Sequence, residues 1–294
     1  MTMRIAFVGL GQMGVPMVHR LLQAGLTVQG VDLNPKAHAA FEGQANYQAH
    51  THVADAVAQA DGVILMLPDS RVVDAVLWTG PSPLSPHLRA GQWLIDMGSS
   101  LPQASQSNAH RLQALGVEFL DAPVSGGVKR AVNGSLSIMV GGSASGFERV
   151  QGVLAHLGTT LTHVGEVGSG HAAKALNNYV SAAGLLAVCE ALNAAQRFGM
   201  DPKVLNQVFN VSTGKNNTTE VKVEAFMLSG RFDSGFAMAL MEKDLRTALG
   251  FMQDVGQPTP QAATCLATWQ AALAELPPGA DHTALFRYLS PQPE

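Results

Sequence analysis

Two side chains in the second half of the chain are placed to act on one small ligand. Lys174 and Asn178 lie four positions apart within a long helical pattern, so an α-helix carries them on the same face. A lysine can exchange a proton, and an amide can both donate to and accept from a ligand oxygen. From periodicity alone, a solvated lysine on an alanine-rich helix is the simpler interpretation, so this pair needs support from other segments.

A short glycine-containing segment supplies a second candidate. Ser125, Gly126 and Gly127 come shortly after the apolar run 117–122. Successive backbone N–H groups in such a turn can form a nest for an anion, and a carboxylate is one such anion. The same residues are also ordinary turn formers, and both interpretations are open at this stage.

The N-terminal segment has the pattern of a dinucleotide-binding loop. An apolar run leads directly into a G-x-G-x-x-G pattern, and a helical run follows. The first glycine permits a tight turn, the second lets the backbone approach a pyrophosphate, and the third lets helix and strand pack closely. The pyrophosphate would lie at the helix N-terminus, where unpaired N–H groups favour an anion. The predicted loop consists of Gly9, Leu10, Gly11, Gln12, Met13 and Gly14.

A carboxylate follows this loop at the expected distance. Asp32 ends the next apolar run and would accept hydrogen bonds from both ribose hydroxyls, while repelling a 2′-phosphate. The predicted cofactor is therefore NAD, with NADP less favoured. Because ligands bind at the carboxyl ends of parallel strands, the strand ends at 67–69 and 96–100 are also expected to face the cofactor. The histidines at 38, 50 and 52 have no acidic or cysteine companion at ligand spacing, so no metal is predicted.

The elements that must position these residues follow from the alternation of patterns. Short apolar runs alternate with helical patterns in the first half, which predicts a parallel sheet covered by helices. After about residue 165 only helical patterns remain. The predicted fold is an α/β, Rossmann-type doubly wound sheet over residues 1–166 followed by an all-α C-terminal domain over 167–294. The expected strands are 5–9, 27–32, 62–67, 93–96, 117–122, 137–141 and 161–165, and a long helix is expected from Ser169 to about Arg197.

Composition excludes several classes of partner. A net charge of −4 without a Lys/Arg run argues against nucleic acid as a partner, and the longest apolar stretches contain polar residues that disfavour a membrane span. Without a signal-peptide pattern, a cytoplasmic location is expected. The stretch 180–192 is apolar on nearly every face, which predicts burial and a homodimer or homotetramer. Cys189 and Cys265 are expected to be small core residues.

Four segments, taken together, resemble the motifs of the β-hydroxyacid dehydrogenases, the group that includes 3-hydroxyisobutyrate dehydrogenase and tartronate semialdehyde reductase. Their order and rough spacing match over essentially the whole chain. They are Phe7-Val-Gly-Leu-Gly-Gln-Met-Gly14, Asp121-Ala-Pro-Val-Ser-Gly-Gly127, Gly165-x-x-Gly-x-Gly-x-x-x-Lys174-x-x-x-Asn178 and Lys243-Asp-Leu245.

The resemblance implies a role for each position. Lys174 would be the catalytic acid/base and Asn178 a substrate hydrogen-bonder, while Ser125, Gly126 and Gly127 would bind the substrate carboxylate. Lys243 would contact the cofactor, and Leu67, Pro68 and Ser99 would line its nicotinamide side. Such a lysine needs its pKa lowered from about 10.4, and a place near a helix N-terminus acts in that direction.

The implied reaction is oxidation of a small 3-hydroxyacid, nominally 3-hydroxyisobutyrate. The close alternative is reduction of 2-hydroxy-3-oxopropionate (tartronate semialdehyde), which the polar residues Lys215, Asn216 and Asn217 favour. Two alternatives belong to other classes of protein. One is an imine reductase, whose members usually lack a lysine at the position of Lys174, and the other is a non-catalytic NAD-binding module, which would not need this lysine.

Overall fold

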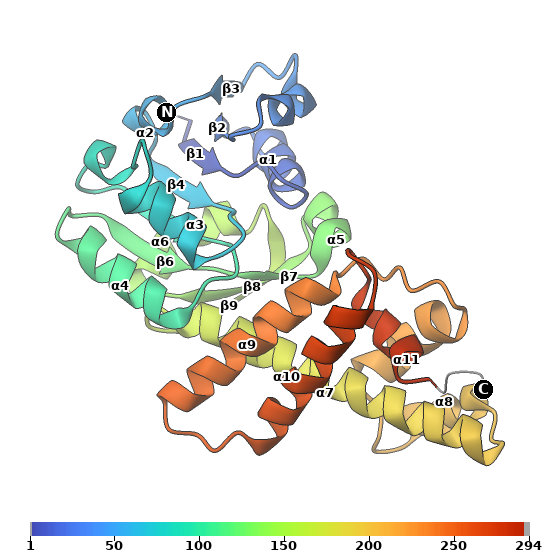
Figure 1. Ribbon diagram of the computed structural model, residues 1–294. Helices are drawn as coiled ribbons and strands as arrows, with labels where there is room; N and C mark the ends of the chain where they lie inside the picture. The colour runs from blue at the N-terminus through green and yellow to red at the C-terminus, as the bar shows by residue number, and fades with distance from the viewer. Residues whose placement is uncertain (1, 291–294) are drawn as a thin grey trace. The chain divides into compact units, whose positions relative to one another are not determined.

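Alternating apolar runs and helical patterns build a nine-stranded sheet in the first part of the chain (Figure 1). The computed structural model describes residues 2–290, and the chain divides into two units, Met1–Lys174 and Ala175–Glu294. The predicted boundary at 166/167 precedes the long helix, whereas the two units part within that helix.

The sheet is mostly parallel, with the strand order β3-β2-β1-β4-β5-β6-β8-β7 and with β9 paired to β8. Only the β6–β8 and β7–β8 pairs are antiparallel among the described strands. The order reverses between β1 and β4, and the crevice at the carboxyl ends of such strands is where doubly wound sheets bind ligands. The strands are β1 (Arg4–Val8), β2 (Thr27–Val31), β3 (Tyr47–His50), β4 (Gly62–Leu65), β5 (Trp93–Asp96), β6 (Glu118–Asp121), β7 (Val124–Ser125), β8 (Leu136–Gly141) and β9 (Gly158–Gly165).

Both faces of this sheet are buried. On β1, Ile5 and Phe7 belong to one apolar core, while Ala6 and Val8 belong to another on the opposite face. Helices α1, α5 and α6 cover the first face, and α2, α3 and α4 cover the second. These helices and short helical segments are α1 (Gly14–Gln23), η1 (Pro35–Phe41), α2 (Val53–Ala58), α3 (Ser70–Asp74), η2 (Ala75–Thr79), η3 (Ser85–His87), α4 (Pro102–Gln113), α5 (Gly127–Asn133) and α6 (Ala144–Leu154).

Over its described residues, which end at 290, the regular structure of the second unit is helical apart from an isolated bridge between Ala237 and Asp281. Its core joins Leu185 and Leu192 of the long helix to Trp269, which is fully buried. The helices are α7 (Ser169–Phe198), which begins in the first unit, α8 (Pro202–Val211), the π-helical segment η4 (Thr218–Leu228), α9 (Met238–Asp254), α10 (Pro260–Glu275), η5 (His282–Ala284) and α11 (Leu285–Tyr288).

The predicted fold class is confirmed, and so is the burial of Cys189 and Cys265. By length and composition α7 could cross a bilayer, but a core helix of a soluble protein meets the same test, and 44% of its most apolar stretch is buried. The sequence-based expectations missed β3, β7 and the π-helical form of η4.

Candidate active site

The glycine loop between β1 and α1 has the geometry that its pattern predicts. Gly9 has a φ of +100°, and a Cβ there would overlap the carbonyl oxygen of Met66. A Cβ at Gly14 would overlap the carbonyl oxygen of Gly9, so the third glycine lets α1 pack against the turn. Gly11 differs, because no described atom lies within 4 Å of its Cβ position. Space beside Gly11 is what a pyrophosphate needs to approach the backbone.

The N-terminus of α1 also fits an anion. Met13 precedes the helix without a side-chain cap, and the first turn contains no acidic residue within the described chain. The first turn itself therefore supplies no carboxylate that would compete with a bound anion. Gln12 is exposed and Met13 is half-buried, as befits a loop that lines a ligand site.

Asp32 ties the end of β2 to this loop. Its Oδ2 accepts a hydrogen bond from the backbone N–H of Leu10 at 2.7 Å, and its Oδ1 accepts one from Asn34 at the same distance. Each carboxylate oxygen can accept a second hydrogen bond. Asp32 therefore fixes the loop and can still receive ribose hydroxyls.

The ends of β4 and β5 adjoin the loop. The Leu67 side chain lies 3.2 Å from the Cβ position of Gly9, and a Cβ at Gly98 would overlap the carbonyl oxygen of Leu67. Pro68 is exposed and Ser99 is half-buried beside them. The structure thus brings together Gly9, Leu67 and the turn that contains Ser99.

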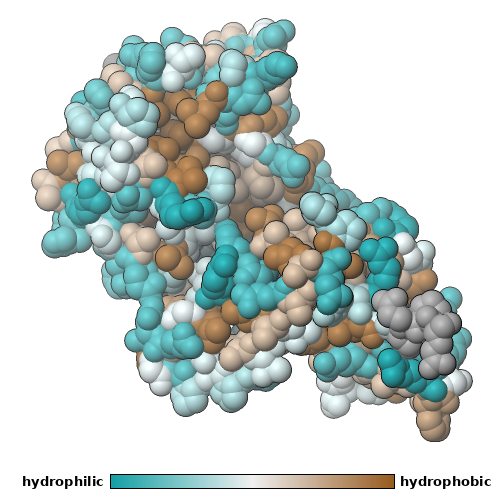
Figure 2. Space-filling model, in the orientation of Figure 1, coloured by the Kyte–Doolittle hydropathy of each residue, from teal (hydrophilic) through white to brown (hydrophobic). Residues whose placement is uncertain are grey.

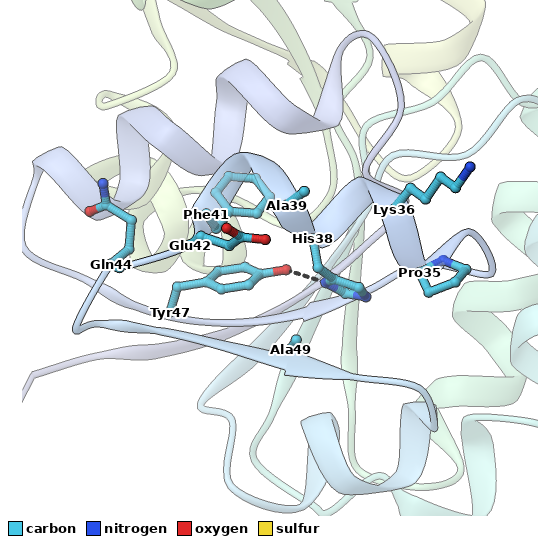
Figure 3. Close-up of a pocket in the computed structure, with 10 residues that line it drawn as sticks. Pro35, Lys36, His38, Ala39, Phe41, Glu42, Gln44, Tyr47 and Ala49 are labelled. Atoms are coloured by element: carbon cyan, nitrogen blue, oxygen red, sulfur yellow. Dashed lines mark hydrogen bonds between the residues drawn. The ribbon is translucent and has the colours of Figure 1, made fainter.

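A separate surface cavity of about 560 Å³ lies over η1 and β3 (Figure 3). Tyr47 stacks on Phe41, with ring centroids 4.3 Å apart, and its hydroxyl is 2.6 Å from Nδ1 of His38. Burial raises the pKa of the Tyr47 phenol, and the charge of Asp32 adds to the rise. None of the ten lining residues is a predicted site residue. Tyr47 instead packs against η1, the helical segment that follows Asp32.

The Ser125-Gly126-Gly127 turn joins β7 to α5. Gly126 and Gly127 have φ values of +128° and +65°, which residues with a side chain rarely adopt. Both glycines are exposed, Ser125 is half-buried, and the Arg130 side chain packs over the Cα of Gly126. The backbone is therefore an irregular turn open to solvent, with the aliphatic part of the Arg130 side chain beside it.

Close backbone contact explains the glycines that precede Lys174. A Cβ at Gly170 would lie 2.5 Å from the carbonyl oxygen of Met139 and 2.7 Å from that of Asp121. Gly165 and Gly168 have φ values of +135° and +94°. The first turn of α7 can therefore rest directly on the ends of β6 and β8, and it leads to Lys174, whose side chain is half-buried.

Asn178 is buried one turn beyond Lys174. Its Nδ2 donates to Oδ2 of Asp244 at 2.6 Å, and its Oδ1 accepts from Nδ2 of Asn177 at 3.1 Å. Lys243 Nζ lies 3.8 Å from the Oδ1 of Asp244. No role is predicted from the sequence for Asp244, although this residue directly follows Lys243. In the structure its carboxylate contacts the Asn178 amide through Oδ2 and lies near the Lys243 ammonium through Oδ1.

The doubly wound sheet, the glycine loop and the carboxylate after β2 define a nicotinamide-dinucleotide-binding protein. Residues 4–165 match the NAD-binding domain of 6-phosphogluconate dehydrogenase, and residues 168–289 match the NAD-binding domain of NADP-dependent 3-hydroxyisobutyrate dehydrogenase. The chain belongs to the β-hydroxyacid dehydrogenase family.

Several relatives match most of the chain. A 2-(hydroxymethyl)glutarate dehydrogenase of Eubacterium barkeri is 36% identical over 89% of this chain and 86% of its own. A 2-hydroxy-3-oxopropionate reductase of Escherichia coli is 34% identical over 98% and 97%. The structure of Mycobacterium tuberculosis 3-hydroxyisobutyrate dehydrogenase with L-serine is 31% identical, with a TM-score of 0.91 over 98% of this chain and 99% of that one.

Proposed function

We propose that this protein oxidises a small 3-hydroxyacid to its semialdehyde with NAD, nominally 3-hydroxyisobutyrate. The observation that carries the proposal is the placement of Lys174 and Asn178 on one face of α7, with the Asn178 amide held by Asp244. A proton-exchanging group and an oriented amide one turn apart suit a ligand with a hydroxyl group.

The proposed mechanism divides the reaction between these residues. A dinucleotide held by the glycine loop and Asp32 would supply the hydride acceptor for the carbon that bears the hydroxyl. Lys174 Nζ takes the hydroxyl proton as the carbonyl forms, and returns it in the reverse direction. Asn178 orients the substrate by hydrogen bonding. The backbone N–H groups of Ser125, Gly126 and Gly127 hold its carboxylate.

The proposed preference for NAD rests on Asp32. Its carboxylate stands at the end of β2, where it accepts from the glycine loop and would face the ribose hydroxyls. Bound NADP would bring its 2′-phosphate close to the Asp32 carboxylate, and the repulsion between these two negative groups disfavours NADP.

The proposed substrate class follows from the chemistry named for the relatives. 3-Hydroxyisobutyrate, 2-(hydroxymethyl)glutarate and L-serine are all 3-hydroxypropanoates that differ in the group on the second carbon. A shared carboxylate and a shared primary alcohol fit one carboxylate turn and one lysine. The residues that surround the second carbon then decide among members of this class.

The polar side chains of the loop that follows α8 interact within the loop and the helical segment after it. Lys215 pairs with Glu220 at 3.0 Å, and Asn216 Oδ1 accepts from the backbone N–H groups of Thr218 and Thr219. Local structure thus accounts for the polarity of Lys215 and Asn216. Reduction of 2-hydroxy-3-oxopropionate remains the alternative, supported by the Escherichia coli relative.

A substrate panel with one variant tests this proposal. Purified enzyme is assayed for NADH formation with 3-hydroxyisobutyrate, glycerate, 2-(hydroxymethyl)glutarate and L-serine, and for NADH consumption with tartronate semialdehyde. We expect the highest kcat/KM with 3-hydroxyisobutyrate, and Lys174→Ala should bind NADH but lose turnover. Turnover retained in Lys174→Ala, or no activity on the whole panel, contradicts the proposal.

We also propose a homo-oligomer. Figure 2 shows hydrophobic residues at the surface, and along α8 the exposed side chains of Val204, Val208 and Val211 follow helical spacing. A second copy of the chain would bury such a stripe. Light scattering coupled to gel filtration measures the mass, and a monomer at micromolar concentration contradicts this part of the proposal.

A further inference from the structure

A buried carboxylate holds the first turn of α7. Asp121 ends β6, and its side chain is fully buried. Oδ1 accepts a hydrogen bond from the backbone N–H of Gly168 at 2.7 Å, and Oδ2 accepts one from that of His171 at 2.7 Å. Both bonds cross about fifty residues of sequence, so they fix the helix to the sheet rather than to its own loop.

These bonds replace a local helix cap. The first N–H groups of a helix have no partner within it, and a side chain just before the helix usually accepts from them. Gly168 stands at that place and has no side chain, so Asp121 supplies the acceptor from a distance. A carboxylate is a strong hydrogen-bond acceptor, and its negative charge also interacts favourably with the positive end of the helix dipole.

The same turn is held from a second side. The ring of His171 is buried, and its Nδ1 is 2.7 Å from the Oγ of Ser105 on α4. Its Nε2 lies 3.9 Å from Oδ2 of Asp96 at the end of β5. The backbone and the side chain of His171 are thus hydrogen-bonded to β6 and α4, and the ring lies close to the end of β5. Lys174 follows three positions later on the same helix.

We infer that Asp121 is a positioning residue that sets the place of Lys174. The inference rests on the proposed role of that lysine. Asp121 also begins the segment that leads through β7 to Ser125, Gly126 and Gly127. One carboxylate therefore fixes the start of the lysine helix to the same strand end that leads into the proposed carboxylate-binding turn.

A double-mutant cycle tests the inference. Asp121→Asn keeps the size of the side chain but turns an amide N–H toward one of the two backbone donors. We expect single-turnover hydride transfer to fall by about 10- to 100-fold in the native background, because a small misplacement of a reacting group has that cost. In a Lys174→Ala background the same change should lower the remaining rate by less than about twofold. Binding of NADH, measured by fluorescence, should stay unchanged.

Asp281→Asn provides the matched control. The Asp281 side chain is also largely buried and also accepts backbone N–H groups, from Gly235, Phe236 and Thr283, but it lies in the second unit. It should lower the melting temperature without lowering hydride transfer in the folded enzyme. A purely structural role for Asp121 would make the two variants behave alike.

The outcomes separate this inference from the proposed function. If Lys174→Ala keeps its activity, the proposed function is wrong. If Lys174→Ala loses most of its activity but Asp121→Asn lowers the remaining single-turnover rate by the same factor as in the native background, only the positioning role is overturned. Should Asp121→Asn not fold, Ser105→Ala enters the same cycle, because it loosens His171 and leaves the backbone bonds in place. A few-fold loss of the single-turnover rate in Ser105→Ala that disappears in the Lys174→Ala background supports the inference. A loss of equal size in both backgrounds overturns it.

Discussion

The buried amide of Asn178 donates to the carboxylate of Asp244 over 2.6 Å, and this bond fixes which way the amide points. Because Oδ1 accepts from Asn177, the nitrogen and oxygen of the amide cannot exchange places without losing both bonds. The second N–H of the Asn178 amide therefore has a defined direction. Asp244 matters to the proposed substrate contact through this orientation.

Removal of the Asp244 charge should weaken substrate binding. In Asp244→Asn the acceptor is replaced by a group that can also donate, so the Asn178 amide loses its single orientation. A hydrogen bond to a charged group contributes about 1.5–3 kcal/mol, which corresponds to a rise of about 10-fold or more in substrate KM. Steady-state kinetics measure this rise, and the Kd of NADH should change little.

The exchanged pair Asn178→Asp with Asp244→Asn is the control. It restores one amide and one carboxylate at hydrogen-bonding distance, so the melting temperature should recover. The KM should stay high, because position 178 no longer has an N–H for the substrate. Recovery of KM in the exchanged pair would mean that Asn178 serves only the fold.

The sequence predicts the elements that its local patterns encode. Six strands (β1, β2, β4, β5, β6 and β8) are largely buried apolar runs, and the sequence predicts each close to its observed bounds, whereas the mostly exposed β9 begins three residues before the predicted start at 161. By contrast, β3 is a partly exposed edge strand with the polar sequence Tyr47-Gln-Ala-His50, and backbone pairing with β2 defines it. The π-helical η4 has no distinct periodic signal, because a helical pattern does not reveal its hydrogen-bond register.

The candidate site likewise contains features that local sequence patterns encode and contacts that only the folded chain creates. Gly9, Gly14 and Asp32 follow a local spacing, and the structure places them together as expected. The bonds from Gly168 to Asp121 and from Asn178 to Asp244 span 47 and 66 residues. No spacing rule contains such a pair, because only the folded chain decides which strand end meets which helix turn.

The choice of cofactor should depend on the Asp32 charge. Asp32→Asn keeps an acceptor for the loop but removes the repulsion of a 2′-phosphate, so the ratio of kcat/KM for NAD to that for NADP should fall by about 10-fold. Asp201→Asn is the control, since Asp201 is a carboxylate of the second unit that caps α8 through the N–H group of Lys203. An unchanged ratio in Asp32→Asn, or an equal fall in Asp201→Asn, would remove Asp32 from the selection of cofactor.

Two glycine-to-alanine changes should have opposite effects. At Gly170 a methyl group would lie 2.5 Å from a carbonyl oxygen of β8, so α7 must shift, and both stability and kcat should fall. Gly152 is in α6 with no atom within 4 Å of its Cβ position, so alanine there should raise stability by about 0.5–1 kcal/mol. Urea unfolding measures both changes. Equal stability of the two variants would contradict the close approach of α7 to the sheet.

Stability should fall in mild acid because of His282. Burial lowers its pKa from 6.5 to about 4, and the charge of Lys222 acts in the same direction, whereas Asp281 opposes it. Between pH 6.5 and 4 the unfolded chain therefore binds a proton that the native protein excludes. The stabilisation is complete above pH 6.5, and the free energy of unfolding should fall by up to about 1.4 kcal/mol for each unit of pH below it.

A variant that cannot titrate separates His282 from other groups. His282→Asn keeps a donor for the carbonyl oxygen of Phe236, which His282 Nδ1 contacts at 3.0 Å. Its melting temperature should vary less between pH 4 and 6.5 than that of the native protein. His52→Asn changes an exposed histidine and should keep the native dependence. The carboxyl of Asp281, whose pKa is lowered below 3.8 by hydrogen bonds from Thr283 despite burial, acts only at lower pH. A slope that persists in His282→Asn would therefore assign the acid sensitivity to a different group.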